Sequence, residues 1–191
     1  MDFEEVSARA EIIDVLYRYA RAVDRMDPAL LRSCYFEDAI DEHIHFFAGP
    51  AGAFVDWVMA SLGKLSFSRH EIANVLIAYR GSEAAVESYW TGRLRATSAE
   101  RQIDIVRGGR YLDKFEKRAG EWRIAHRRSL PEFSRTTPAA PEDLGIPVYE
   151  VDHGMLEIRG TRDRFDPSYQ LFGDDPEVIV DSLINLGYYR A

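Results

Sequence analysis

The sequence has almost no cysteine and no long apolar run. Its 191 residues include one cysteine, Cys34, which excludes a disulfide within the chain and is typical of a reducing compartment. We expect Cys34 to be a small buried core residue. No segment approaches the roughly 18 apolar residues of a membrane span, and the first five residues are too acidic for a signal peptide. These absences predict a soluble cytoplasmic protein with no membrane partner.

Positive charge is also scarce. The chain has 24 Lys and Arg against 32 Asp and Glu, which leaves a net charge of −8, and the acidic residues are spread along the sequence. Proteins that bind nucleic acids need a basic face for the phosphates. We therefore expect no nucleic-acid partner.

Motifs of several enzyme classes are missing. The sequence contains no Gly-x-Ser-x-Gly nucleophile motif, no phosphate-binding loop and no Gly-x-Gly-x-x-Gly dinucleotide motif. Gly108 and Gly109 lie inside a stretch rich in β-branched and aromatic residues, where we interpret them as a bulge that bends a strand. The sequence therefore implies no cofactor.

The first third of the chain has mainly helical periodicity. Hydrophobic residues make up 46% and charged residues 29%, a composition typical of a globular domain. Asp2 followed by Glu5 resembles a capping box, and Asp27 with Pro28 is typical of a second helix start. The predicted elements are helices at 3–25, 28–35 and 51–62, a turn at 37–38 and a strand at 39–47.

The middle of the chain changes to strand-like patterns separated by short turns. The predicted strands are residues 70–79, 84–97, 103–117 and 121–133. Helices followed by antiparallel strands indicate an α+β fold, in which N-terminal helices pack on a strongly curved, mainly antiparallel sheet. We expect a pocket between the helices and the sheet.

The composition shifts again after Arg135. Residues 136–141 resemble a linker, but the following segment contains too many aromatic residues for a disordered tail. The sequence therefore predicts a domain at 1–135 and an extension at 136–191. We expect the extension to pack on the domain or on a neighbouring subunit, with a terminal helix at 178–186.

Asp24 occupies an unfavourable place at the end of the first predicted helix. A carboxylate in the last turn meets the negative end of the helix dipole, which costs about 0.3–1 kcal/mol unless a donor or cation answers it. Asp24 is not needed as a cap, because Asp27 takes that place. A functional site is one expected cause of such a conflict, and an ordinary solvated aspartate is the alternative.

His70 opens the first long predicted strand, and it could reach the same pocket mouth as Asp24. A carboxylate beside an imidazole orients the ring and supports its cationic form, which makes the ring a better general base. A surface or core histidine is the alternative.

Arg127 and Arg128 lie in a predicted strand with alternating faces. Strict alternation points one arginine toward the concave face and the other outward. A buried arginine requires a carboxylate or a developing anion, whereas a solvated strand charge requires neither. We expect Arg123 and Arg127 to lie on one face of this strand. The other face is expected to carry Trp122, Ile124, His126 and Arg128.

Asp41, His43 and His45 alternate along one predicted strand. Such a run is compatible with metal ligands, but no further ligand follows at a recognisable spacing, so we predict no metal site and keep it only as an alternative. The same residues could line the pocket and bind polar groups of a substrate. Aromatic candidates for that lining, or alternatively for the core, are Tyr19, Tyr35 and Trp57.

Several segments resemble the SnoaL-like branch of the nuclear-transport-factor-2-like superfamily. The resemblance covers about residues 5 to 134 and implies a cone-shaped α+β barrel. It also implies a homo-oligomer, either a dimer or a trimer, that forms through the open sheet. The segments that carry it are residues 16–24, the strand after Ala39, Gly49-Pro50, residues 70–74, Gly108–Tyr111 and Gly120–Ile124.

Within this superfamily the pattern is most similar to hexachlorocyclohexane dehydrochlorinase, scytalone dehydratase and bile-acid 7α-dehydratase. Those enzymes pair an aspartate at the end of the first helix with a histidine at a strand start, which correspond to Asp24 and His70. The resemblance further implies roles for Arg127, five residues after a tryptophan, and for Tyr19, five residues before the aspartate. Polar residues at 41–43 depart from the apolar lining of the dehydrochlorinase, and the extension has no counterpart.

The resemblance implies a cofactor-independent lyase of the dehydratase or dehydrohalogenase type, acting on a small hydrophobic or polycyclic substrate. Asp24 would orient His70, His70 would remove a carbon-bound proton, Arg127 would stabilise the developing negative charge, and Tyr19 would donate a hydrogen bond. An isomerase or cyclase that begins with the same proton abstraction is one alternative. A non-catalytic binding or scaffold module is the other. The expected substrate-binding residues are Tyr35, Asp41, His43 and Trp57.

Overall fold

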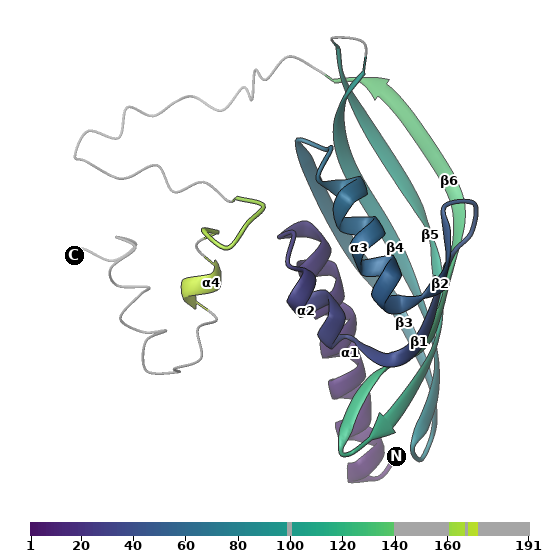
Figure 1. The fold of residues 1–191 in the computed structure, drawn as a ribbon. Coiled ribbons are helices and arrows are strands. Elements are labelled where there is room, and N and C mark those ends of the chain that lie inside the picture. The colour runs from purple at the N-terminus through teal and green to yellow at the C-terminus, as the bar shows by residue number, and fades with distance from the viewer. Residues whose placement is uncertain (99–100, 140–160, 167, 172–191) are drawn as a thin grey trace, which may run out of the picture. The chain divides into compact units, whose positions relative to one another are not determined.

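The computed structural model describes residues 1–98, 101–139, 161–166 and 168–171 (Figure 1). The chain divides into two units, Met1–Ala139 and Ala140–Ala191. In the second unit the description is limited to one turn and the short helix α4, Ser168–Leu171. Most of the predicted extension, including its terminal helix, therefore lies outside the described residues.

Three helices make up the helical part of the first unit. Helix α1, Phe3–Asp24, begins where the Asp2 side chain accepts a hydrogen bond from the Glu5 amide at 2.8 Å. Helix α2, Pro28–Ser33, begins where Asp27 accepts a hydrogen bond from the Leu30 amide at 3.0 Å. Both predicted helix starts are thus confirmed. Helix α3 spans Ala51–Leu62, as predicted.

A six-stranded sheet accounts for the rest of this unit. Its order is β2-β1-β6-β5-β4-β3, and every neighbouring pair is antiparallel except β1 with β6. The predicted α+β fold with a mainly antiparallel sheet is confirmed. The strands are β1 Tyr35–His43, β2 Phe47–Pro50, β3 Phe67–Arg80, β4 Glu83–Ser98, β5 Arg101–Arg118 and β6 Glu121–Pro138.

Helices α1, α2 and α3 lie on one side of the curved sheet (Figure 1). The core between the two layers contains fully buried Leu16, Phe54 and Phe115. Each such side chain contributes about 1.5–3 kcal/mol through burial. Cys34 is buried in the same core, and burial raises the pKa of its thiol to about 11. No helix among the described residues is long and apolar enough to cross a membrane.

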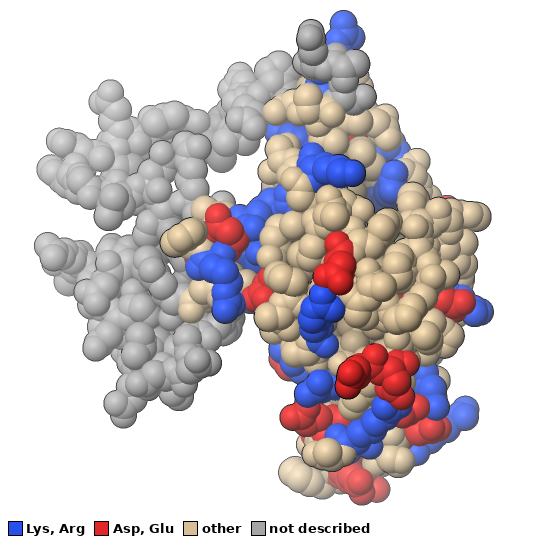
Figure 2. Space-filling view, in the orientation of Figure 1, with Lys and Arg blue, Asp and Glu red and all other residues tan. Residues whose placement is uncertain are grey.

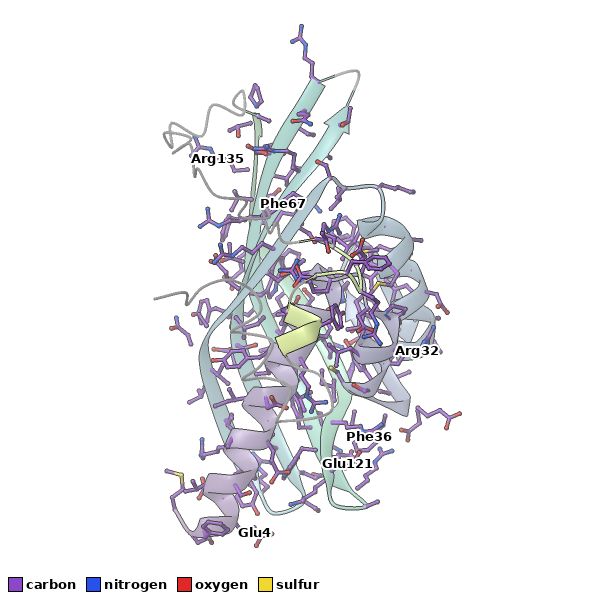
Figure 3. All side chains as sticks on the ribbon, turned by 90° about the vertical axis from the view of Figure 1, so that its left-hand side faces the viewer. Glu4, Arg32, Phe36, Phe67, Glu121 and Arg135 are labelled. Carbon is purple, nitrogen blue, oxygen red and sulfur yellow. The ribbon has the colours of Figure 1, made fainter. Side chains whose placement is uncertain are left out.

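Charged side chains are not spread evenly over the surface of the first unit. Charged side chains gather at the end where α1 begins (Figure 2), and there Arg118 pairs with Asp38 at 2.6 Å. Glu121 lies toward this end, whereas Phe67 and Arg135 lie toward the opposite end of the sheet (Figure 3). Exposed ion pairs of this kind are weak stabilisers, because water and salt screen the attraction between their charges.

The β1 region differs from the prediction in two ways. Residues 37–38, expected to form a turn, lie within β1, and the strand expected at 39–47 is split by a turn at 44–46. The amide of Phe46 donates to the carbonyl of His43 at 2.8 Å and closes this turn. His45 sits there with φ 71° and is exposed. The prediction that Asp41, His43 and His45 share one strand face is therefore wrong for His45.

Two bulges interrupt β6. Gly108 pairs with Phe133 and Gly109 with Pro131, so the predicted bulge is confirmed, although the extra residue, Glu132, belongs to β6. A Cβ atom on Gly109 would lie 2.0 Å from the carbonyl oxygen of Leu130, which explains the need for glycine.

The second bulge lies at Ala125, because Lys114 pairs with His126 and Phe115 pairs with Ile124. One inserted residue reverses the alternation of faces beyond it. Trp122 and Ile124 are consequently buried on the same face as Arg127, and Arg123 is not. The predicted grouping of Arg123 with Arg127 is wrong for this reason.

Candidate active site

A cavity of about 350 Å³ lies between the helices and the sheet of the first unit. Its apolar wall comes mainly from α3 and from β4 and β5. Two other hollows, of about 410 and 570 Å³, are lined by none of the histidines that face this cavity. Its polar lining residues are Tyr19, His43, Ser61, His70, Arg107, Tyr111 and Ser129.

Asp24 and His70 meet at one wall of the cavity. The Oδ1 atom of Asp24 lies 2.7 Å from Nδ1 of His70, and its Oδ2 accepts the backbone amide of His70 at 2.7 Å. Asp24 is only 8% exposed. The backbone amide and the ring of His70 thus stabilise a carboxylate that the dipole of α1 disfavours. The sequence analysis expected these two residues near one pocket, and the structure brings them together.

The other ring nitrogen of His70 lies over a gap in the cavity wall. Gly92 pairs with His70 on one side and with Arg107 on the other, so the three residues form a row across β3, β4 and β5. A Cβ atom on Gly92 would lie 3.4 Å from Nε2 of His70. Because glycine has no side chain, Nε2 is open to the cavity, and a ligand can lie between the imidazole and Arg107.

Arg107 is a cation of the cavity wall that the sequence analysis missed. Its guanidinium carbon lies 5.4 Å from the centroid of the Phe46 ring, a cation–π contact. Its Nε is buried and has no hydrogen-bond partner within the described part of the chain. Strand alternation alone could not single it out, because its importance depends on the pairing with Gly92 and His70.

Arg127 lies behind the cavity wall. It is fully buried and donates two hydrogen bonds to the Asp113 carboxylate, at 2.8 and 2.7 Å. Its guanidinium carbon lies 4.1 Å from the Tyr19 ring centroid and 4.0 Å from that of Tyr111. Burial opposes its charged form, but the attraction and hydrogen bonds of Asp113 outweigh burial and raise the pKa of Arg127. The structure thus separates Arg127 from the cavity by two tyrosine rings.

Three buried tyrosines surround this arginine. Burial raises the pKa of Tyr111 to about 12, and it raises the pKa values of Tyr19 and Tyr35 above the ordinary value as well. Their hydroxyl groups therefore stay protonated at neutral pH and can donate hydrogen bonds. Tyr19 and Tyr111 line the cavity, as does Trp57. Tyr35 does not line it, because its hydroxyl donates to Asp41 at 2.6 Å.

Asp41 and His43 form a second carboxylate–imidazole pair. Asp41 is fully buried, and its Oδ1 contacts Nδ1 of His43. His43 lines the cavity and stacks on Phe54 with ring centroids 4.6 Å apart. Asp41 itself lies outside the lining. Among the residues with described positions, no three His, Cys, Asp or Glu side chains gather as a metal site would require.

Two further lining residues escaped the sequence analysis. Trp90 stacks on Tyr111 with centroids 5.6 Å apart, and Ser129 comes from β6. Neither carries a distinctive motif. A glycine inside a strand was the one usable signal, because such a residue often marks a close approach of another group, and it would have pointed to Gly92.

Solved structures with this fold include proteins from several bacteria. A hexachlorocyclohexane dehydrochlorinase, LinA Type2, has a TM-score of 0.65 and 15% identity, covering 75% of this chain and 99% of its own. A candidate scytalone dehydratase from Novosphingobium aromaticivorans has a TM-score of 0.62 and 20% identity, covering 74% and 93%. At these identities the likeness shows the fold alone.

The function-unknown protein Rv3472 from Mycobacterium tuberculosis has a TM-score of 0.57 and 19% identity to this chain. The match covers 96% of this chain and 90% of Rv3472. No curated protein sequence matches the chain. The family model for the SnoaL-like domain matches residues 4–128. The chain therefore belongs to the SnoaL-like domain family.

Proposed function

We propose that this protein is a cofactor-independent lyase of the dehydratase or dehydrohalogenase type. It removes a carbon-bound proton next to an activating group and expels a leaving group from the neighbouring carbon. The observation that carries the proposal is the contact between Asp24 and His70 at the cavity wall, with Nε2 of His70 open to the cavity over Gly92.

His70 acts as the general base. When the Nδ1–H group of His70 donates a hydrogen bond to Asp24, the neutral ring presents the lone pair of Nε2 to the substrate. Asp24 keeps the ring in this tautomer and stabilises the imidazolium that forms when the proton arrives. A positioned base of this kind contributes about 10²–10⁴-fold to the rate.

Side chains at the cavity wall stabilise the negative charge that develops on the substrate. Tyr19 lines the cavity and its hydroxyl remains protonated, so it donates a hydrogen bond to a forming enolate oxygen. Arg127 supports this oxygen from behind the Tyr19 ring. Arg107 supplies a positive charge on the wall itself, in register with His70.

A small ring compound with one or two oxygen or halogen substituents suits this cavity. Its volume of about 350 Å³ lies at the small end of ligand pockets, which span roughly 300–1,000 Å³. Trp57, Trp90 and Leu94 supply an apolar lining for a ring. Two of the solved structures with this fold bear the names of a dehydrochlorinase and a dehydratase, which is consistent with elimination chemistry.

Incubation of the protein with a β-hydroxy ketone, 4-hydroxy-4-phenylbutan-2-one, in D₂O tests the proposal. We expect NMR to show loss of the proton next to the carbonyl and formation of the unsaturated ketone. His70→Gln should abolish both, whereas His126→Gln should not, because His126 pairs with Glu42 outside this cavity. Deuterium exchange without elimination would favour an isomerase, and the absence of both signals would favour a binding module.

A further inference from the structure

The cavity receives two histidines from opposite flanks of the sheet. His70 belongs to β3, at one edge, and His43 belongs to β1, which is separated from β3 by β6, β5 and β4. Each histidine uses Nδ1 for a carboxylate, Asp24 in one case and Asp41 in the other. Nε2 of His43 has no hydrogen-bond partner among the residues that the structure describes. Both rings therefore border the same cavity.

The buried groups around His43 include two carboxylates but one guanidinium. Asp41 and Asp113 are both buried, and Arg127 lies between them in the sheet, paired with Asp41 across β1 and with Asp113 across β5. The two hydrogen bonds of Arg127 go to Asp113. One guanidinium cannot balance two carboxylates, and an unpaired buried charge is costly. His43 is the group in contact with Asp41 that can carry a second positive charge.

We propose that His43 is the general acid of this site, and that it protonates the departing oxygen of a β-hydroxy substrate. The inference rests on the proposed function and sharpens it, because hydroxide needs a proton to leave and halide does not. A general acid at this position favours elimination of water over elimination of halide. Asp41 is a positioning residue that holds the ring and its charge.

The step is balanced. The proton next to the carbonyl moves to Nε2 of His70, and the C–H electron pair forms the new C=C bond. The C–O bond breaks toward oxygen, which takes the proton from Nε2 of His43 and leaves as water. One proton then returns from His70 to His43 through solvent, and no oxidant or reductant is needed.

Two probes that differ only in the leaving group test the assignment. The first is 4-hydroxy-4-phenylbutan-2-one, and the second is the same ketone with a 4-nitrophenoxy group in place of the hydroxyl. Nitrophenoxide leaves without a proton, so only the first probe requires a general acid. Both give the same unsaturated ketone, which can be followed by its ultraviolet absorption.

We expect His43→Gln to slow elimination of water by about 10²–10⁴-fold and elimination of nitrophenoxide by less than about tenfold. Asp24→Asn should slow both probes alike. The matched control His126→Gln should change neither. Because the two probes are compared in one protein sample, their rate ratio does not depend on how much of a variant is folded.

Equal losses for the two probes in His43→Gln would overturn the acid role and leave the proposed function standing. A larger loss for nitrophenoxide than for water would overturn it as well. If the wild-type protein eliminates neither group, elimination itself is refuted, and the role of His43 falls with it.

Discussion

The two carboxylate–histidine pairs have the same chemistry in different surroundings. Asp24 and His70 are 46 positions apart and meet only because α1 ends beside β3. Asp41 and His43 are two positions apart on β1, so they lie on one face of the strand, and there their side chains contact each other. The first pair therefore depends on the tertiary fold for its existence, and the second depends on it only for its environment.

That environment is where the pairs differ. Asp24 remains 8% exposed and receives both of its donors from His70, whereas Asp41 is fully buried and shares its charge between Tyr35 and His43. The carboxylate of the second pair is therefore the more enclosed of the two. The comparison teaches that one motif can occur in two different settings, and the proposed roles of base and acid follow this difference.

The largest effect should follow from breaking the first pair at its carboxylate. Asp24→Asn keeps the shape but cannot stabilise an imidazolium, and it permits the wrong tautomer of His70. We expect the folded structure to persist and elimination to fall by about 10³–10⁴-fold, the scale found when a triad aspartate is replaced by asparagine. Steady-state rates together with circular dichroism measure both. Unchanged turnover would remove Asp24 from the mechanism.

The buried ion pair of Arg127 and Asp113, which lies behind the second pair, should be the charged contact whose loss lowers stability most. Arg127→Ala leaves Asp113 buried without its partner, and we expect it to lower the free energy of unfolding by about 3–5 kcal/mol. Arg128→Ala, on the exposed face beside Glu42, should cost under about 1 kcal/mol. Urea denaturation compares them. Elimination should also fall much more in Arg127→Ala than in Arg128→Ala, and the reverse order would mean that the β6 register is wrong.

Alkaline pH offers a way to examine the buried aromatic surroundings of the second pair. The pKa of Tyr111 rises from 10.0 to about 12 on folding, because burial disfavours the phenolate. Its contribution to stability is therefore complete below pH 10 and is lost as the pH rises toward 12. The loss amounts to about 2–3 kcal/mol at most.

Tyr111→Phe should flatten this part of the stability curve. The measurement is the free energy of unfolding between pH 9 and pH 12 for both proteins. A variant curve as steep as that of the wild type would show that other groups cause the alkaline loss.

The smallest expected effect comes from filling the gap beside the first pair. Gly92→Ala places a methyl group 3.4 Å from Nε2 of His70, which displaces a bound substrate slightly. We expect elimination to fall by about tenfold with little change in stability. Gly52→Ala, whose Cβ would contact only the Arg32 side chain, is the matched control. Equal rates in both variants would mean that substrate does not lie over Gly92.

The candidate site could be predicted only in part from sequence. Tyr19, Trp57, His43 and His70 line the cavity as expected, because each sits on an element whose type the local pattern indicates. Arg127, by contrast, was expected at the substrate and lies behind two tyrosine rings. The expected face of Arg123 was wrong because a single inserted residue at Ala125 reverses the alternation, and no glycine marks this bulge in the sequence as Gly108 and Gly109 mark the other.

The sequence by itself determined the α+β class, the two helix caps at Asp2 and Asp27, and the conflict between Asp24 and its helix dipole. These follow from local periodicity and hydrogen bonding, which act over a few residues. The tertiary structure alone decided that Gly92 stands between His70 and Arg107. It also decided that Arg127 lies between Asp41 and Asp113 in the sheet and donates its two hydrogen bonds to Asp113. Strand register and burial decide such matters, and both depend on residues far apart in the chain.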